Sequence, residues 1–253
     1  MSIKVGQQVA LFVKKNLPML IKNSPAFKAK NYRQALIDGF LGIDKRLETP
    51  EGRKELIAIN ATMNSSGKSP TAEALQSDPE ELANYVGCTA CAAIITKTEI
   101  YVANSGDSRC VLSKNGIAIN MSEDHKPDLE NEKKRIIKAD GYVEENRVNG
   151  VLNLSRSLGD LEYKQNKKLK PEEQMITAYP DVKVEKISNE TDFLIIACDG
   201  IWDCMTSQNA VDFVKEQILK SSYKQDKTYK LSKIIEAMLD KIVAPSVEAN
   251  GTM

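Results

Sequence analysis

Three aspartates have the residue type and the setting that a metal-dependent centre needs. Asp199 follows the apolar run 193–198, and Asp203 lies four residues further on. Asp107 stands in the turn 105–109, between two segments that we expect to be strands. A carboxylate held at the rim of a core is costly to desolvate unless something compensates its charge. Carboxylates without histidine or cysteine partners suit hard cations such as Mg²⁺ or Mn²⁺.

Each of these aspartates also has an ordinary structural interpretation. Asp-Gly and Gly-Asp are frequent turn dipeptides, which would account for Asp107 or Asp199 taken alone. Asp203 alone could cap a helix or carry a solvated charge. The three positions therefore indicate a function only together with the sequence that surrounds them.

Two helices are predicted near the start of the chain. Apolar residues recur at helical spacing over residues 7–22, where Pro18 is expected to bend or interrupt the helix. Ser24 and Pro25 have the pattern of an N-cap followed by proline at the first helical position. One face of a second, long helix is marked by Tyr32, Leu36, Phe40, Ile43 and Leu47. Residues 60–71 are predicted to form a break, because they contain a run typical of loops.

The middle of the chain is predicted to be rich in strands. The Asn115-Gly116 dipeptide is a strong hairpin signal. A helix is expected over residues 129–139, ended by Gly141, and two amphipathic helices close the chain. The expected strands cover residues 89–95, 99–104, 109–113, 117–119, 151–154, 182–187 and 193–198. Hairpin-linked strands predict stacked antiparallel sheets covered by helices, an α+β fold, and we expect residues 1–253 to form a single domain.

Composition excludes several classes of function. The 35 basic residues balance the 35 acidic ones, so no overall positive field attracts a nucleic acid or an anionic membrane. No apolar run approaches the roughly 20 residues of a membrane helix. The five cysteines and the absence of a signal-peptide pattern favour an intracellular compartment, cytoplasmic or nuclear. We expect the protein to be a monomer.

Cys88 and Cys91 form a C-x-x-C pair that could indicate a redox or zinc site. The surrounding segment is predicted to be a strand, in which positions three apart point to opposite faces. No second pair of cysteine or histidine ligands completes a zinc site. An ordinary structural role is therefore the preferred interpretation.

Six short motifs occur in the order in which the type 2C (PPM) family of metal-dependent protein phosphatases carries them. The chain resembles this family over nearly its whole length. The motifs are G-C-T-A at 87–90, V-A-N-S-G-D-S-R at 102–109, D-H-K-P at 124–127, R-V-N-G at 147–150 with S-R-S-L-G-D at 155–160, P-D-V at 180–182, and A-C-D-G-I-W-D at 197–203.

The resemblance implies an αββα sandwich and a protein serine/threonine phosphatase that acts on phosphoproteins. It implies two or more Mg²⁺ or Mn²⁺ ions at one end of the sandwich, where a metal-bound hydroxide attacks phosphorus. By the resemblance, Asp199 is a core metal ligand, and Asp107 and Asp203 serve an additional, weaker site.

Other residues of these motifs are expected to have structural roles. Asn149, Arg156 and Asp160 are expected to hold loops and sheet edges together. The single histidine, His125, belongs to the D-H-K-P motif and is not expected to replace the family's general acid.

Both ends of the chain depart from the family pattern. The family's D-G-H-G motif and its phosphate-binding arginine precede the first helix, but the corresponding positions here are Ser2, Ile3, Lys4 and Val5. The family's final motif supplies a further aspartate ligand, whereas this chain ends at 250–253 with no aspartate. We therefore assign no catalytic residue, and we expect terminal strands of the sandwich to be missing.

Two functional hypotheses follow from these departures. The first is a phosphatase whose sequence has been shortened at both ends. The second is a catalytically inactive pseudophosphatase that binds phosphoproteins as a regulatory module. An unrelated β-rich protein would require six ordered motif matches to be coincidence. Residues 60–79 and 164–170 are candidate substrate loops, although ordinary solvated loops have the same composition.

Overall fold

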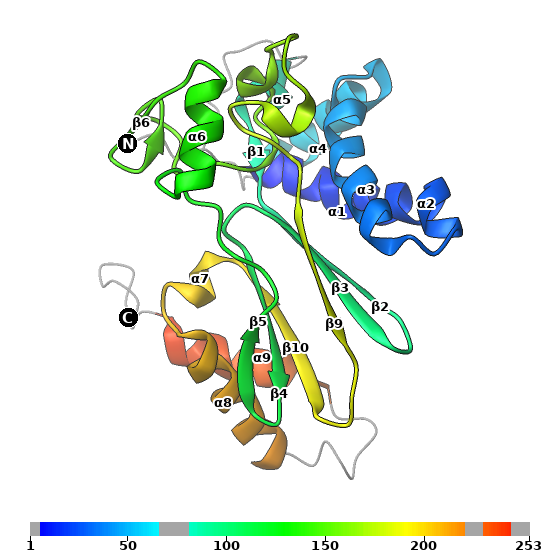
Figure 1. The fold of residues 1–253 in the computed structure, drawn as a ribbon, viewed down its shortest axis with the longest axis vertical. Coiled ribbons are helices and arrows are strands. Elements are labelled where there is room, and N and C mark those ends of the chain that lie inside the picture. Colours follow the sequence, from blue (N-terminus) through cyan, green and yellow to red (C-terminus); the bar gives the residue numbers. More distant parts are fainter. Residues whose placement is uncertain (1–5, 66–80, 221–229, 244–253) are drawn as a thin grey trace.

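The computed structural model describes residues 6–65, 81–220 and 230–243. Two three-stranded antiparallel sheets pack face to face, and helices lie on their outer sides (Figure 1). This arrangement confirms the predicted α+β sandwich. None of the described helices is long and apolar enough to cross a membrane.

The first sheet has the strand order β2-β3-β9, and both of its strand pairs are antiparallel. Its strands are β2 (Ala90–Ile95), β3 (Glu99–Ser105) and β9 (Asp181–Lys186). Side chains alternate across β3, as the pleat requires. Ile100 and Val102 face the second sheet, whereas Tyr101 and Ala103 pack with the helices outside.

The second sheet has the order β10-β4-β5 and is also antiparallel. It contains β4 (Arg109–Lys114), β5 (Ile117–Asn120) and β10 (Thr191–Ala197). The turn between β4 and β5 confirms the predicted hairpin. Asn115 and Gly116 have φ angles of 51° and 79°, the positive pair that a type I′ turn requires.

The core between the sheets is built by the inward-facing residues of β3 and β4. Its fully buried members are Ile100, Val102, Cys110, Leu112 and Met121. The alternate residue Val111 points outward and packs under the second helical layer. Each central strand therefore contributes to two cores, which fixes its register against both neighbours.

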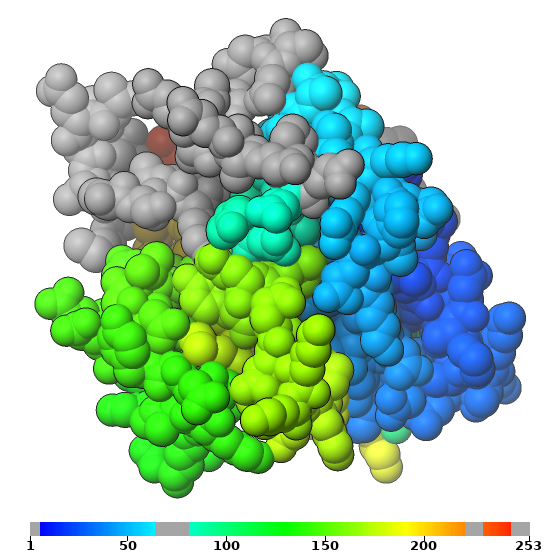
Figure 2. Space-filling model, turned by 90° about the horizontal axis from the view of Figure 1, so that it is seen from above, coloured from blue at the N-terminus to red at the C-terminus, as the bar shows by residue number. Residues whose placement is uncertain are grey.

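The first helical layer covers the outer face of the first sheet. It consists of α1 (Gln7–Asn23), α2 (Pro25–Lys28), α3 (Tyr32–Leu47) and α4 (Pro50–Ser65). Helix α3 packs on β3 and β9, and its fully buried residues include Leu36, Phe40 and Ile43. Figure 2 shows these blue helices beside the green and yellow-green segments of residues 130–178.

The second helical layer covers the other sheet with α7 (Asp199–Trp202), α8 (Ser207–Lys220) and α9 (Ser232–Ile242). The remaining elements connect the layers at one end of the sandwich. They are α5 (Leu82–Tyr85), α6 (Glu130–Lys138), the short pair β1 (Gly87–Cys88) and β8 (Leu158–Gly159), the hairpin β6 (Val143–Glu144) and β7 (Arg147–Val148), and two 3₁₀ turns, Leu161–Lys164 and Pro171–Glu173.

Three local expectations were wrong. Pro18 does not interrupt α1: the helix continues past it, with Leu17 and Ile21 on either side buried in the same core. Residues 60–65 belong to α4 rather than to a break, and the rest of the predicted break lies outside the described residues. Residues 151–154 form no strand, and only an isolated bridge joins Leu152 to Val148.

The cysteine interpretation holds in the described part of the chain. Cys88 and Cys91 are both free thiols. Cys88 packs against the core under the first helical layer, whereas Cys91 packs into the core between the sheets. The two thiols therefore belong to different cores and form no common site.

A buried ion network ties α6 to the start of β9. Glu132 is 3% exposed and accepts hydrogen bonds from Arg156 Nη2 at 2.6 Å, Arg135 Nη1 at 2.7 Å and Ser155 Oγ at 2.7 Å. Arg156 also donates to Asp181 Oδ1 at 2.9 Å. Burial alone would raise the pKa of Glu132, but the hydrogen bonds from Arg156 and the charges of both arginines lower it to about 2.

Replacing Glu132 by glutamine should reduce the free energy of unfolding by about 3–5 kcal/mol at pH 7, because the largely buried guanidinium of Arg135 loses its counter-charge and that of Arg156 keeps only Asp181. Urea unfolding measures this loss. The variant Glu130→Gln, on the exposed side of the same helix, should leave the unfolding midpoint almost unchanged. Equal midpoints for both variants would contradict the structural role of Glu132.

The same glutamate should make the wild-type protein sensitive to acid. Its pKa is lowered on folding, so its stabilising contribution is complete above about pH 4.5 and is lost as the pH falls toward 2. The lost contribution is on the order of 3 kcal/mol. Unfolding free energies of wild type and Glu132→Gln, measured between pH 5 and 2, should therefore converge. A constant difference across this range would contradict the assignment.

Candidate functional site

The sheet topology brings Asp107 and Asp199 to the same end of the sandwich. Strands β4 and β10 are antiparallel, and Arg109 pairs with Ala197 in their ladder. The turn that precedes β4 therefore lies beside the first residues that follow β10. Figure 1 shows α7 at this end of the second sheet. This placement agrees with the expectation that carboxylates gather at one end of the fold.

Asp199 and Asp203 lie one helical turn apart. The backbone N–H of Asp203 donates to the carbonyl of Asp199 at 2.7 Å. Trp202 anchors this turn, because its ring is buried and its Nε1–H donates to the Ala197 carbonyl at 2.8 Å. Both carboxylates are exposed, and no hydrogen bond or ion pair from the described residues engages either side chain. They are therefore available to a ligand.

Asp107 has a different environment. Its side chain is only 6% exposed, and its Oδ2 lies 2.5 Å from the ammonium of Lys126. Burial opposes the charge of Lys126, but the hydrogen bond to Asp107 raises the pKa of the ammonium above its usual value. Lys126 therefore stays protonated and already compensates the buried carboxylate.

The turn that carries Asp107 depends on a glycine. Gly106 has a φ of +115°, a conformation that side chains rarely adopt. A Cβ atom at this position would also lie 2.3 Å from Cγ2 of Thr89. The glycine therefore allows the turn to approach the strand segment that contains Thr89.

His125 fixes this turn through hydrogen bonds with the backbone of Gly106. Its Nδ1 accepts the backbone N–H of Gly106 at 3.1 Å, so the ring proton lies on Nε2, which contacts Asp181 Oδ2 at 3.1 Å. The backbone N–H of His125 also donates to the Gly106 carbonyl at 3.1 Å. The imidazole is 3% exposed and both of its nitrogens are engaged. It positions the turn and has no free nitrogen to protonate a leaving group.

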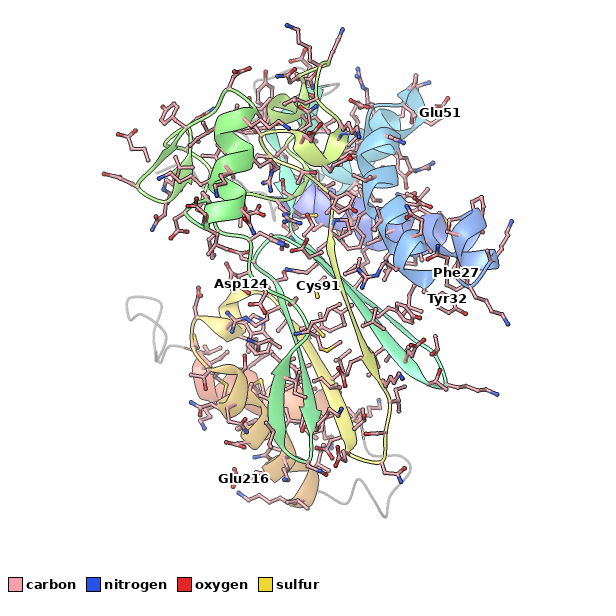
Figure 3. All side chains as sticks on the ribbon, in the orientation of Figure 1. Phe27, Tyr32, Glu51, Cys91, Asp124 and Glu216 are labelled. Atoms are coloured by element: carbon pink, nitrogen blue, oxygen red, sulfur yellow. The ribbon has the colours of Figure 1, made fainter. Side chains whose placement is uncertain are left out.

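Arg109 connects the turn to α7. It makes a two-pronged ion pair with Asp124, with Nε–Oδ1 and Nη2–Oδ2 distances of 3.0 and 2.8 Å. The hydrogen bonds with Asp124 raise the pKa of this guanidinium. The guanidinium carbon also lies 5.4 Å from the centre of the Trp202 ring, within the range of a cation–π contact. Figure 3 labels Asp124 near the upper end of the second sheet, beside α7.

These residues fit a divalent ion in part. Asp199 and Asp203 offer exposed, unengaged carboxylates, which suit a hard cation. Asp107 does not fit as it stands, because Lys126 occupies its carboxylate. Within the described residues, no group of three or more histidine, cysteine or acidic side chains is arranged to hold an ion. Residues 2–5 and 250–253, where the sequence departs from the family pattern, lie outside the described residues.

Comparison with known proteins decides the family. The family model described as Protein phosphatase 2C matches residues 2–251. The chain belongs to the protein phosphatase 2C family. It is 40% identical to "Probable protein phosphatase 2C 11" of Oryza sativa subsp. japonica, over 95% of this chain and 70% of that protein. It is 43% identical to "Probable protein phosphatase 2C 3" of Paramecium tetraurelia, over 98% of this chain and 75% of that protein.

A solved structure supports the fold independently. The crystal structure of serine-threonine phosphatase 2C from Toxoplasma gondii superposes with a TM-score of 0.64 and covers 93% of this chain and 76% of its own. The two sequences are 20% identical, so this likeness concerns the fold alone. The predicted resemblance is thus confirmed, and the unrelated β-rich protein is rejected.

Membership in the protein phosphatase 2C family identifies the chain as a metal-dependent serine/threonine protein phosphatase by family. The pseudophosphatase hypothesis is not favoured by these comparisons. Sequence reasoning singled out the three aspartates as candidate ligands but assigned no role to Lys126, Arg109 or Asp124. The only available signal was their presence in two of the six motifs, because their partners lie 15 or 19 positions away in the sequence.

Replacing Arg109 by lysine should lower the free energy of unfolding by about 1–2 kcal/mol, since an ammonium cannot reproduce the two-pronged pair or the stacking on Trp202. Urea unfolding followed by tryptophan fluorescence reports this change at the site itself, because Trp202 is the only tryptophan. The exposed control Arg53→Lys on α4 should change stability by less than about 0.5 kcal/mol. Indistinguishable curves for the two variants would show that Arg109 does not organise the site.

Proposed function

We propose that this chain hydrolyses phosphoserine and phosphothreonine in phosphoproteins, with Mg²⁺ or Mn²⁺ bound at the end of the sandwich that carries Asp199, Asp203 and Asp107. The observation that supports this proposal best is the pair of exposed carboxylates on one turn, at the same end of the sandwich as the buried carboxylate of Asp107. An isolated turn aspartate would not require several carboxylates at one end of the fold. Membership in a phosphatase family makes a metal-dependent centre the simplest use of them.

The three aspartates have different proposed roles. Asp199, at the end of β10, is the core ligand, and Asp203 and Asp107 belong to an additional, weaker site. A bound divalent ion would supply a Lewis acid and a water of lowered pKa for attack on phosphorus. The chain itself supplies rigidity. Trp202 anchors the turn that carries Asp199 and Asp203, and Arg109 fixes the ring of Trp202.

The proposed partners follow from composition and family. Phosphoproteins are the proposed substrates, and the balanced charge of the chain gives no basis for binding nucleic acid. All five cysteines lie in the described residues and are free thiols. Free thiols support a reducing intracellular compartment such as the cytoplasm. We propose that the protein acts there as a monomer.

The variant Asp199→Asn tests the proposed metal site. It should lower phosphopeptide hydrolysis in Mn²⁺ by at least about 100-fold, because even the outer partners of a metal ligand typically contribute 10–100-fold. Its melting temperature without metal should equal that of wild type, since no described residue depends on this side chain. Hydrolysis is measured by phosphate release, and melting by calorimetry.

The matched control is Asp38→Asn, an exposed aspartate on α3 in the opposite helical layer. It should retain wild-type hydrolysis. Undiminished activity in Asp199→Asn would contradict the role of Asp199. A wild-type chain that binds the phosphopeptide without releasing phosphate at any Mn²⁺ concentration would contradict the proposed activity and restore the binding-module hypothesis.

A further inference from the structure

The most informative contact outside the proposed ligand pair is the one between Lys126 and Asp107. The Lys126 Nζ to Asp107 Oδ2 distance is 2.5 Å. The side chain of Asp107 is 6% exposed, whereas that of Lys126 is 41% exposed. One partner is therefore fixed in the fold, and the other reaches it from the solvent side.

Asp107 needs a cation in this position. A buried carboxylate without a counter-charge is strongly unfavourable, and no other hydrogen bond to its side chain is present among the described residues. The turn around it is held rigidly, because the Gly106 backbone is bound to His125 through both its N–H and its carbonyl. In this conformation Asp107 is buried, so the cation that compensates its charge must lie against it.

Two further carboxylates interact with the same ammonium. Lys126 has electrostatic interactions with Asp124 and Asp203 as well as with Asp107. Asp124 is already neutralised by its two-pronged pair with Arg109. Asp203 has no such partner in the described part of the chain. The ammonium of Lys126 thus interacts with two carboxylates that have no other cation paired to them in the described residues, the buried Asp107 and the exposed Asp203.

We propose that Lys126 is a resident cation that occupies Asp107 in place of a divalent ion and so controls whether Asp107 and Asp203 accept one. This proposal rests on the proposed metal-dependent function. In one state the ammonium is paired with Asp107. In the other, a divalent ion takes the carboxylate and Lys126 extends into solvent, which its exposed position permits. The two cations compete for one negative charge.

The competition has a chemical consequence for this site. Mg²⁺ gives up bound water reluctantly and needs several charged oxygens to remain in place. An ion that must first displace an ammonium binds with a less favourable free energy than an ion that binds an unpaired carboxylate. The Asp107–Asp203 site should therefore fill only at high ion concentration, whereas a site that uses Asp199 has no such competitor among the described residues.

The experiment uses the full chain and Tb³⁺ as a luminescent substitute for the divalent ion. Excitation of the only tryptophan sensitises Tb³⁺ bound nearby, and Trp202 directly precedes Asp203. The variant Lys126→Met removes the ammonium but keeps an apolar side chain of similar length. The control Lys97→Met removes an exposed lysine from the far end of β3, in the turn before Glu99.

Lys126→Met should bind Tb³⁺ at least about tenfold more tightly than wild type, because a neighbouring positive charge has been removed from a poorly hydrated site. Lys97→Met should match wild type. The double variant Lys126→Met/Asp107→Asn should lose the gain. An unchanged dissociation constant in Lys126→Met, or a gain that survives in the double variant, would overturn the proposal.

A second measurement keeps the proposal testable if Lys126→Met is less stable. Its melting temperature should fall without metal, because Asp107 is left unpaired, and Mn²⁺ should restore it through preferential binding to the folded state. The double variant should melt higher than Lys126→Met without metal and should gain less from Mn²⁺. Destabilisation that Mn²⁺ does not reverse would also overturn the proposal.

These outcomes separate this proposal from the proposed function. If the wild-type chain shows no ion binding that requires Asp199, the metal centre itself is contradicted. Intact binding at Asp199 with no effect of Lys126→Met would contradict only the role of the lysine.

Discussion

A series of ion pairs and hydrogen bonds, from α6 to the turn that carries Asp107, controls the geometry of the site. Glu132 on α6 binds Arg156, Arg156 binds Asp181 at the start of β9, and Asp181 contacts His125, which holds the backbone of Gly106. The buried charge of Glu132 is compensated by Arg156, and the 60% exposed carboxylate of Asp181 pairs with Arg156 and contacts the His125 ring. The turn that carries Asp107 is positioned at the end of this series. The rigidity of this turn therefore depends on residues that lie outside the turn itself.

The sandwich provides the frame in which this series can exist. Strands β3 and β9 belong to the sheet under α3, whereas β4 and β10 belong to the sheet under α8. The core between the sheets keeps the ends of β3 and β10 at a fixed separation, because its side chains are closely packed. The site is then assembled from the turn after β3, the loop that contains residues 124–126, and the first turn after β10.

Local signals in the sequence were sufficient for the strands of the two three-stranded sheets, although they also predicted a strand at 151–154 that does not form, and for the placement of Asp199 and Asp203 on one turn. The Asn115-Gly116 turn needs only its own dihedral preferences, and the four-residue spacing of Asp199 and Asp203 places both on one helical turn. The predictions that were wrong or missing concern residues whose structure is determined by tertiary contacts. Asn60 has loop-like chemistry, yet it lies in α4 and accepts a hydrogen bond from Gln8 on α1. The pairing of Lys126 with Asp107 joins residues 19 positions apart, which no local pattern reveals.

The same separations in sequence have a consequence for how the protein folds. His125 and Asp181 are 56 positions apart, and Arg109 and Ser207, which are joined by a hydrogen bond, are 98 positions apart. Contacts between such distant segments form slowly, because the loop-closure entropy must be overcome before the contact stabilises anything. A partly folded or nascent chain therefore has its carboxylates but not their arrangement. The site should be among the last features to form, so that an ion or a phosphoprotein is recognised only after the two sheets have met.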